Sequence, residues 1–318
     1  MKNSKDFRKF MAKARKITRP NNKSILNNIC FKNGWAIATN LRESVNLVLH
    51  THELDGYMVN HRELSKALKA NSVIAVRNNR IVVDNAILVI LETSNNDSFP
   101  AIPCYTGFGE AVSQSDIDAY NVCKHFVSRD ETRFFLNGVY FGDDIVATDG
   151  RQLHLMSTDS DLKGSIVMVS KLLDKVTVTK AELTKYELFV IDADFTYSVS
   201  LIEGQFPNYK RVFPDDGMCD YKHTIVTNSI VKQLKAIEAI EGKNFNQGVI
   251  FHNNKVTSDK LEMECEFNTG IAFKINPQYV IDYFKYCGDS CTWFVKNERS
   301  VMQLMSDFGV HLIMPMVL

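Results

Sequence analysis

The spacing of apolar side chains predicts helices that alternate with short strands along this chain. Between Phe7 and Ile17 the apolar residues recur every three or four positions, so they share one helix face, whereas Arg8, Lys9 and Lys16 project from the other. Similar spacing predicts further helices at 61–70, 115–127, 170–178, 228–240 and 276–286. Short β-branched runs predict strands that include 81–83, 165–168 and 189–191.

The chain repeats itself with a period of about 110 residues. The segment 26–31 recurs at 136–141 and, more weakly, at 246–251. Two more landmarks follow each copy in the same order. The second lies at 38–40, 147–149 and 256–258, and the third, a strand end that runs into a helix, lies at 59–61, 169–171 and 275–277. A period this long indicates domains of like fold and excludes a solenoid of short repeats.

The repeat predicts an α+β protein of three tandem domains. Proline and glycine cluster at 98–103 and 213–217, as expected of linkers. We therefore expect domains at 1–103, 104–216 and 217–318.

Composition places the chain among proteins that fold in water. It has 318 residues, 45% hydrophobic and 23% charged, without an apolar run long enough for a membrane span. Seven cysteines without paired CxxC spacing predict neither a disulfide framework nor a zinc site, and the first residues lack the apolar core of a secretory signal. We expect a reducing, cytoplasmic location.

Charge is unevenly distributed, although the net charge is zero. Residues 1–103 hold 16 basic and 8 acidic side chains, so the remainder is acidic by the same margin. Basic residues on predicted helices of all three domains suggest one surface that binds DNA phosphates without reading sequence, although a solvated face without a partner would also explain the first helix taken alone. The candidate DNA-binding residues are Arg8, Lys9, Lys13, Lys16, Arg19, Lys23, Lys66, Lys69, Lys171, Lys175, Lys232 and Lys235.

Three segments resemble the bacterial DNA sliding clamp, the DNA polymerase III beta subunit. Residues 129–139 with 146–150 resemble its middle domain, 201–214 its linker between the second and third domains, and 312–318 its C-terminus. The resemblance implies a processivity factor: antiparallel sheets outside, helices lining a ring around duplex DNA, and two protomers joined head to tail. It further implies a protein without catalysis or cofactor, near the nucleoid of a bacterial or phage-infected cell.

The same resemblance implies a peptide-binding pocket for DNA polymerase, the clamp loader and repair proteins, which insert short motifs rich in Gln, Leu and Phe. Carried over by position, this pocket comprises Leu136, Thr148, Gly150, Leu153, Pro207, Val212, Tyr279, Leu312, Ile313, Met314, Pro315 and Met316. Two positions depart from the family pattern: Gln152 and Val317 stand where an arginine is usual. We therefore expect a rim with less positive charge.

Ring closure is expected to join the first domain of one protomer to the third domain of the next. The candidate interface residues are Ile87, Val89, Leu91, Ile237 and Ile240. A monomeric clamp-like decoy and a nonspecific DNA-coating protein remain alternatives.

An enzyme is the less favoured alternative. The motifs GxxxxGK[ST], GxGxxG, GxSxG and HExxH are all missing from the sequence. The run 50–53 contains two histidines and a glutamate, but no matching cluster accompanies it, so we expect no metal site. A metal-dependent nuclease would need clustered carboxylates.

Overall fold

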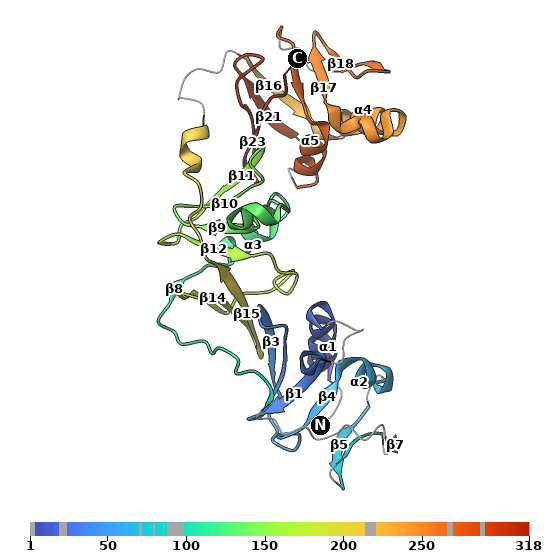
Figure 1. The fold of residues 1–318 in the computed structure, drawn as a ribbon, viewed down its shortest axis with the longest axis vertical. Coiled ribbons are helices and arrows are strands. Elements are labelled where there is room, and N and C mark those ends of the chain that lie inside the picture. Colours follow the sequence, from blue (N-terminus) through green and yellow to red (C-terminus); the bar gives the residue numbers. More distant parts are fainter. Residues whose placement is uncertain are drawn as a thin grey trace. The chain divides into compact units, whose positions relative to one another are not determined.

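The computed structural model describes residues 4–18, 24–69, 72–78, 80–84, 86–87, 98–213, 221–265, 270–286 and 290–317, with the backbone alone at 86–87, 221–228 and 243–244. The chain divides into two compact units. The first contains Met1–Ile117 and Val167–Leu201, and the second contains Asp118–Ile166 and Ile202–Leu318. Figure 1 labels many of the elements of each unit.

The first unit is built on a large antiparallel sheet, a small antiparallel sheet and two helices. Its elements are α1 (Lys5–Ile17), η1 (Ile25–Asn27), β1 (Asn28–Lys32), β2 (Trp35–Thr39), β3 (Glu43–Val48), β4 (Met58–Asn60), α2 (His61–Ala67), β8 (Glu110–Ala111), β13 (Lys180–Leu183), β14 (Glu187–Asp192) and β15 (Phe195–Ile202). The strand order is β4-β1-β2-β3-β15-β14-β13-β8, and a separate small sheet contains β5 (Ile74–Arg77), β6 (Arg80–Val83) and β7 (Ala86–Ile87). Helix α1 packs against β3, β2 and α2.

The second unit contains two antiparallel sheets. Its elements are η3 (Glu131–Leu136), β9 (Gly138–Phe141), β10 (Asp144–Thr148), β11 (Gln152–Ser157), η4 (Tyr209–Val212), β16 (Tyr221–Val226), α4 (Thr227–Glu241), η5 (Gly242–Gln247), β17 (Val249–His252), β18 (Lys255–Thr257), β19 (Glu262–Glu264), β20 (Phe273–Ile275), α5 (Pro277–Phe284), β21 (Ser290–Val295), β22 (Met302–Ser306) and β23 (Gly309–Ile313). The larger sheet runs β16-β21-β22-β23-β11-β10-β9, and the smaller runs β19-β18-β17-β20. Helix α3 (Gln114–Cys123) and strand β12 (Ser165–Met168) lie where the chain passes between the units.

The landmarks of the sequence repeat fall on equivalent elements. Hairpins β1–β2, β9–β10 and β17–β18 follow α1, α3 and α4 in turn. In the first and third copies the strand before the next helix, β4 or β20, pairs with the first strand of its hairpin. The fold is thus a repeated α+β motif with antiparallel sheets, as the sequence predicts.

The compact units nevertheless cut across the predicted domain boundaries, because strands of neighbouring repeats pair with each other. Strand β3 pairs with β15 from Glu43↔Val199 to Leu47↔Phe195, and Ser44 and Ser198 share a hydrogen bond of 2.8 Å. Strand β11 pairs with β23 from Gln152↔Ile313 to Leu155↔Val310. The boundaries near 103 and 216 stay a prediction.

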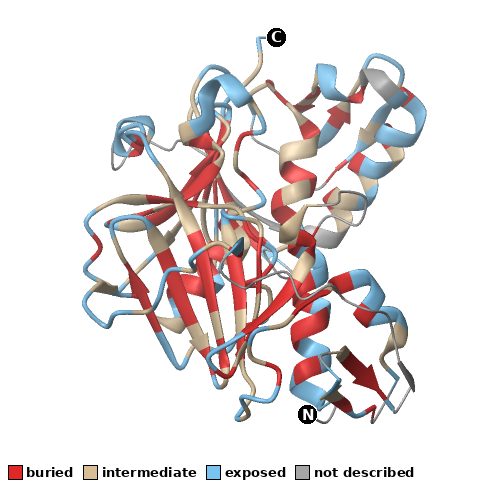
Figure 2. Ribbon diagram, turned by 60° about the horizontal axis from the view of Figure 1, so that its bottom comes forward, coloured by how far each residue is buried: buried red, intermediate tan, exposed pale blue. Residues whose placement is uncertain are grey.

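Most predicted helices are present with shorter or slightly shifted ends, and the apolar face of α1 is buried as predicted (Figure 2). The prediction of a helix at 170–178 is wrong. Residues 172–175 form turns between β12 and β13, although Leu172, Leu173 and Val176 are buried at helical spacing. Lys175 has a φ of 56°, a left-handed conformation that a right-handed helix cannot contain.

Gly309 tests how closely β23 approaches β11. Its φ is 97°, and a Cβ atom there would lie 2.1 Å from the carbonyl oxygen of Leu155. We expect Gly309→Ala to lower the free energy of unfolding by more than about 2 kcal/mol in urea titrations. Gly242→Ala is the matched control, because its φ is 57° and nothing lies within 4 Å of the added atom; we expect a loss of about 1 kcal/mol from strain alone. Equal losses would contradict the close approach.

Candidate functional site

An apolar groove in the second unit is the first candidate site. It encloses about 150 Å³ at the edge where β10, β11 and β23 meet the segment 206–212. Its lining residues are Leu136, Thr148, Gly150, Arg151, Gln152, Leu153, Phe206, Pro207, Asn208, Tyr209, Val212, Val301, Leu312 and Met314.

The floor of the groove is buried and its rim is exposed. Leu136, Leu153 and Leu312 are buried in one hydrophobic cluster with Phe206 and Tyr209. Val212 is 41% exposed and Met314 is 45% exposed. A partly exposed branched side chain and a flexible methionine over an aliphatic floor suit the docking of apolar peptide side chains.

Aromatic contacts hold the segment 206–212 over the sheet. The ring of Phe206 stacks on Tyr140 with centroids 4.9 Å apart. The Tyr209 hydroxyl donates a hydrogen bond of 2.8 Å to Asp144, and burial with this carboxylate raises the pKa of Tyr209. These contacts hold the wall of the groove against the sheet.

The turn between β10 and β11 is fixed by its own polar groups. The Thr148 hydroxyl donates to the carbonyl of Gln152 at 2.6 Å, and Asp149 accepts from both the backbone and side-chain nitrogens of Gln152 at 2.9 and 3.0 Å. Gly150 has a φ of 89°, and a Cβ atom there would lie 2.6 Å from a guanidinium nitrogen of Arg133. This position favours glycine because of its positive φ, whereas the flexible end of the Arg133 side chain can move aside.

Eight of the twelve residues expected in the peptide pocket line this groove, and four do not. In β23, alternate side chains face opposite ways, so Ile313 points into the core with no exposure while Leu312 and Met314 face the groove. Met316 pairs with Lys274 and lies against Gly248. Tyr279 lies near Asp149 and Arg151, and burial raises the pKa of its hydroxyl. Pro315 does not line the groove.

The structure adds lining residues that the sequence analysis missed. Phe206, Asn208 and Tyr209 could have been predicted from the sequence, because they lie beside Pro207 in the linker segment 201–214. Val301 had no such signal, since the pairing of β22 with β23 brings it to the groove. Arg151 also lines the groove and is exposed. Arg151 therefore places one positive charge at the groove beside Gln152.

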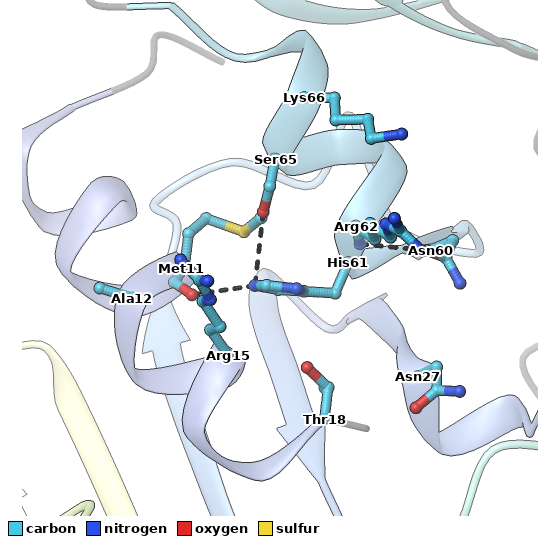
Figure 3. Close-up of a pocket in the computed structure, with 10 residues that line it drawn as sticks. All are labelled: Met11, Ala12, Arg15, Thr18, Asn27, Asn60, His61, Arg62, Ser65 and Lys66. Atoms are coloured by element: carbon cyan, nitrogen blue, oxygen red, sulfur yellow. Dashed lines mark hydrogen bonds between the residues drawn. The ribbon is translucent and has the colours of Figure 1, made fainter. Parts of the chain in front are cut away.

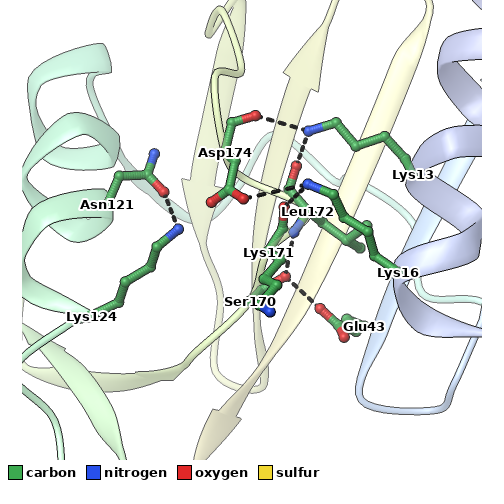
Figure 4. A network of polar contacts seen from close by, with 9 residues as sticks. All are labelled: Lys13, Lys16, Glu43, Asn121, Lys124, Ser170, Lys171, Leu172 and Asp174. Atoms are coloured by element: carbon green, nitrogen blue, oxygen red, sulfur yellow. Dashed lines mark hydrogen bonds and ion pairs between the residues drawn. The ribbon is translucent and has the colours of Figure 1, made fainter.

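The basic helix α1 is the second candidate site, and its lysines are less available than expected. Lys9 forms an ion pair of 3.0 Å with Asp192. Lys16 contacts Asp174 at 3.3 Å and the carbonyl oxygen of Lys171 at 2.7 Å (Figure 4). Lys13 is buried, and its ammonium donates to the carbonyl oxygens of Leu172 and Asp174. Lys13 is therefore removed from the predicted DNA-binding residues, because its ammonium is bound to carbonyl oxygens of a turn in the same chain.

The structure describes most of the other candidate DNA-binding cations. Seven of them are exposed: Arg8, Lys66, Lys69, Lys171, Lys175, Lys232 and Lys235. The other two, Arg19 and Lys23, lie outside the described residues.

The structure describes only part of the candidate ring interface. Val89 and Leu91 lie outside the described residues, and for Ile87 the structure describes the backbone of β7 alone. Ile240 is 50% exposed. Ile237 is removed from the predicted interface residues. It is fully buried, because it lies with Ile230 and Leu234 on the inward face of α4.

The histidine run at 50–53 forms separate local contacts. His52 lies 2.7 Å from Asp55, and His50 lies 3.7 Å from Asp194. Within the described ranges, no three His, Cys, Asp or Glu side chains converge as metal ligands. Nor does any helix in that part of the chain have the length and apolarity to cross a membrane.

Comparisons with known proteins connect this arrangement to one family. No family model matches the chain. The beta sliding clamp of Treponema pallidum is 35% identical over 145 residues, which span 39% of this chain and 38% of that relative. The beta sliding clamp of Buchnera aphidicola is 25% identical over 89% of this chain and 88% of that relative. The crystal structure of the DNA polymerase III subunit beta from Pseudomonas aeruginosa has a TM-score of 0.81 at 18% identity and covers 100% of this chain and 99% of that one.

The buried ammonium of Lys13 gives the first unit a specific pH dependence. Burial, with a smaller contribution from Lys16, lowers the pKa of Lys13 from 10.5 to about 8. Between these values the unfolded chain binds more protons than the folded chain, so the contribution of Lys13 to stability rises with pH. We expect the stability of the wild type relative to Lys13→Met to increase between pH 8 and pH 10 in urea titrations. A difference that stays constant over this window would contradict the burial.

Proposed function

Because this chain is a divergent member of the bacterial sliding clamp family, we propose that it is a processivity clamp. In this proposal it encircles duplex DNA as a ring and tethers DNA polymerase and other replication or repair proteins. It catalyses no reaction and needs no cofactor. It works in the cytoplasm at the nucleoid of a bacterial or phage-infected cell.

The observation that carries the proposal is the groove. A repeated fold alone would suit many proteins, but this groove is formed where strands of the second and third predicted domains, β11 and β23, pair edge to edge. The residues expected from the family resemblance supply its floor at Leu136, Leu153 and Leu312 and its rim at Val212 and Met314. A short peptide with Leu or Phe anchors complements such a surface, since apolar anchor side chains that enter a hydrophobic groove are a recurring mode of peptide recognition.

DNA binding in the proposal depends on charge alone. The exposed Lys66 and Lys69 near α2, Lys171 and Lys175 around the turn, and Lys232 and Lys235 on α4 can neutralise phosphates without contacting base edges. Such contacts are weak and sensitive to salt, which is compatible with sliding. We propose that two copies close the ring head to tail, with the first domain of one copy against the third domain of the other.

Two neighbouring methionines separate groove binding from general stability. Met314 lines the groove, whereas Met316 packs beside Gly248 outside it. We expect Met314→Ala to weaken the binding of a Gln-, Leu- and Phe-containing peptide about tenfold, equivalent to about 1.4 kcal/mol. Met316→Ala should leave peptide affinity unchanged. Isothermal titration of both variants checks this, and equal losses would remove the groove as the peptide site.

Topological retention on DNA tests the clamp function itself. The chain is loaded onto nicked circular DNA by a matched clamp loader, freed of unloaded protein by gel filtration, and then treated with a restriction enzyme. We expect the protein to stay with the circle and to leave when the DNA is linearised. Equal retention on linear and circular DNA would favour a nonspecific coating protein.

The decoy alternative differs in its oligomeric state. Analytical ultracentrifugation of the chain alone should give a dimer at micromolar concentration, which ring closure requires. A monomer that binds the peptide but is not retained on circular DNA would favour a decoy.

A further inference from the structure

A second apolar pocket lies within the first unit and shares no lining residue with the groove. This first-unit pocket encloses about 510 Å³ between the large sheet and a roof formed by residues 99–105. Apolar and aromatic side chains make up most of its lining, and none of the described lining residues is acidic. Pockets of this size and composition are typical binding sites for small organic molecules.

The floor of the first-unit pocket is a row of side chains that crosses five strands. Cys30 of β1 pairs with Ile37 of β2, and Ile37 pairs with Asn46 of β3. Asn46 pairs in turn with Thr196 of β15, and Thr196 pairs with Ile191 of β14. All five residues line the pocket, because directly paired residues project from the same face of a sheet.

The roof is held over this row from both ends. At its start, Phe99 is buried in one cluster with Cys30 of the floor. Beyond its end, the carboxylate of Glu182 accepts hydrogen bonds from the backbone nitrogens of Thr106 and Gly109 at 2.7 and 3.0 Å. The roof forms neither helix nor strand on its way toward β8 (Figure 1). Its position therefore depends on these side-chain and backbone contacts.

Two polar side chains restrict what the first-unit pocket can bind. The Oδ1 atom of Asn46 is buried and has no hydrogen-bond partner in the described part of the chain. An unpaired buried acceptor costs free energy, which a ligand with an N–H or O–H donor would recover. Lys32 follows Cys30 on the same face of β1, is exposed and lines the pocket, so it offers a positive charge to a carboxylate.

The positions of these two groups set the length of a suitable ligand. Lys32 and Asn46 are separated by two strands and two residues, which places their Cα atoms roughly 12 Å apart. Between them Trp35 pairs with Lys32 and is half-buried, as is Tyr105 of the roof. Aromatic faces favour a planar ring, which would lie between a donor at one end and an acid at the other.

We propose that the first-unit pocket binds a small planar aromatic acid that also carries an N–H or O–H donor. The donor bonds to Oδ1 of Asn46, the carboxylate faces Lys32, and the ring lies beside Trp35. The site belongs to the first unit alone. It goes beyond the proposed clamp function and needs neither DNA nor ring closure.

The probe is indole-3-acetate, which combines an aromatic ring, one N–H donor and one carboxylate. The full chain is labelled with 5-fluorotryptophan, and its two tryptophans are Trp35 in the pocket and Trp293, fully buried in the second unit. Fluorine NMR titration should shift the Trp35 signal and leave the Trp293 signal in place. Loss of one signal in Trp35→Phe assigns the pair. An unmoved Trp35 signal at millimolar probe would overturn the proposal, as would equal shifts of both signals.

Two analogues of the probe test the two polar contacts without altering the protein. 1-Methylindole-3-acetate has no donor, and we expect it to bind the wild type about fivefold more weakly than the parent. Indole-3-acetamide has no charge, and we expect a loss of about threefold, since Lys32 is exposed and its ion pair is screened. If the three compounds bound equally, no specific contact would remain and the site would be rejected.

Three variants assign these losses to residues. Asn46→Leu removes the acceptor at similar volume, so the parent and its methylated analogue should bind it equally. Lys32→Gln should abolish the preference for the acid over the amide. Lys180→Gln is the charge-matched control, because Lys180 is an exposed cation of the same unit outside the pocket lining, and it should keep both preferences.

Thermal unfolding accompanies these titrations. We expect Asn46→Leu to be no less stable than the wild type, because it removes an unpaired buried oxygen. If the acid lost the same affinity in Lys180→Gln as in Lys32→Gln, the effect would be one of general charge and the assignment to Lys32 would fail. Persistence of the parent's advantage over its methylated analogue in Asn46→Leu would likewise refute the contact with Asn46.

Discussion

Antiparallel pairing between the edge strands of successive repeats is the constraint on which the other features depend. An isolated sheet leaves unpaired N–H and C=O groups along its edge, and these groups readily pair with another strand. Here β3 pairs with β15 and β11 pairs with β23, so each repeat satisfies the edge of the next. The same pairing explains why the compact units cut across the boundaries that the repeat predicts.

The groove follows directly from the pairing of β11 with β23. It brings Leu312 and Met314 beside Leu153 and the turn at Gly150, although these residues are far apart in the chain. Behind the groove, His154 and His311 face each other across the two strands. Both are fully buried against the aromatic rings of Phe126 and Tyr283, and burial lowers the pKa of His154 to about 3. Burial also lowers the pKa of His311, so the neutral form of both rings is favoured behind the groove.

The cations of α1 illustrate that a basic helix need not be a uniform binding face. A buried backbone carbonyl without a partner is costly, and Lys13 satisfies the carbonyls of Leu172 and Asp174 in the turn at 171–175. Lys16 bonds to the carbonyl of Lys171 at the surface. These hydrogen bonds hold the turn at 171–175, which is not helical, against α1. Arg15, on a neighbouring stripe, is exposed and lines a hollow with Arg62 and Lys66 of α2 (Figure 3). Adjacent positions on one helix can therefore have different roles within the same run of basic residues.

The sequence by itself determined the repeat, the α+β class and most elements, because these depend on local periodicity. Phe7, Phe10 and Ala14 could be assigned to the buried face of α1 from their spacing alone. The turn at 171–175 could not be separated from a helix, because its leucines have helical spacing and its carbonyls are satisfied by lysines about 160 positions away. Linker residues such as Pro207 could be assigned to the groove through the family resemblance, but Val301 and the inward orientation of Ile313 depended on strand pairing. Periodicity fixes which face of an element is apolar, whereas the partner of that face is decided by pairing between distant segments, which only the tertiary structure contains.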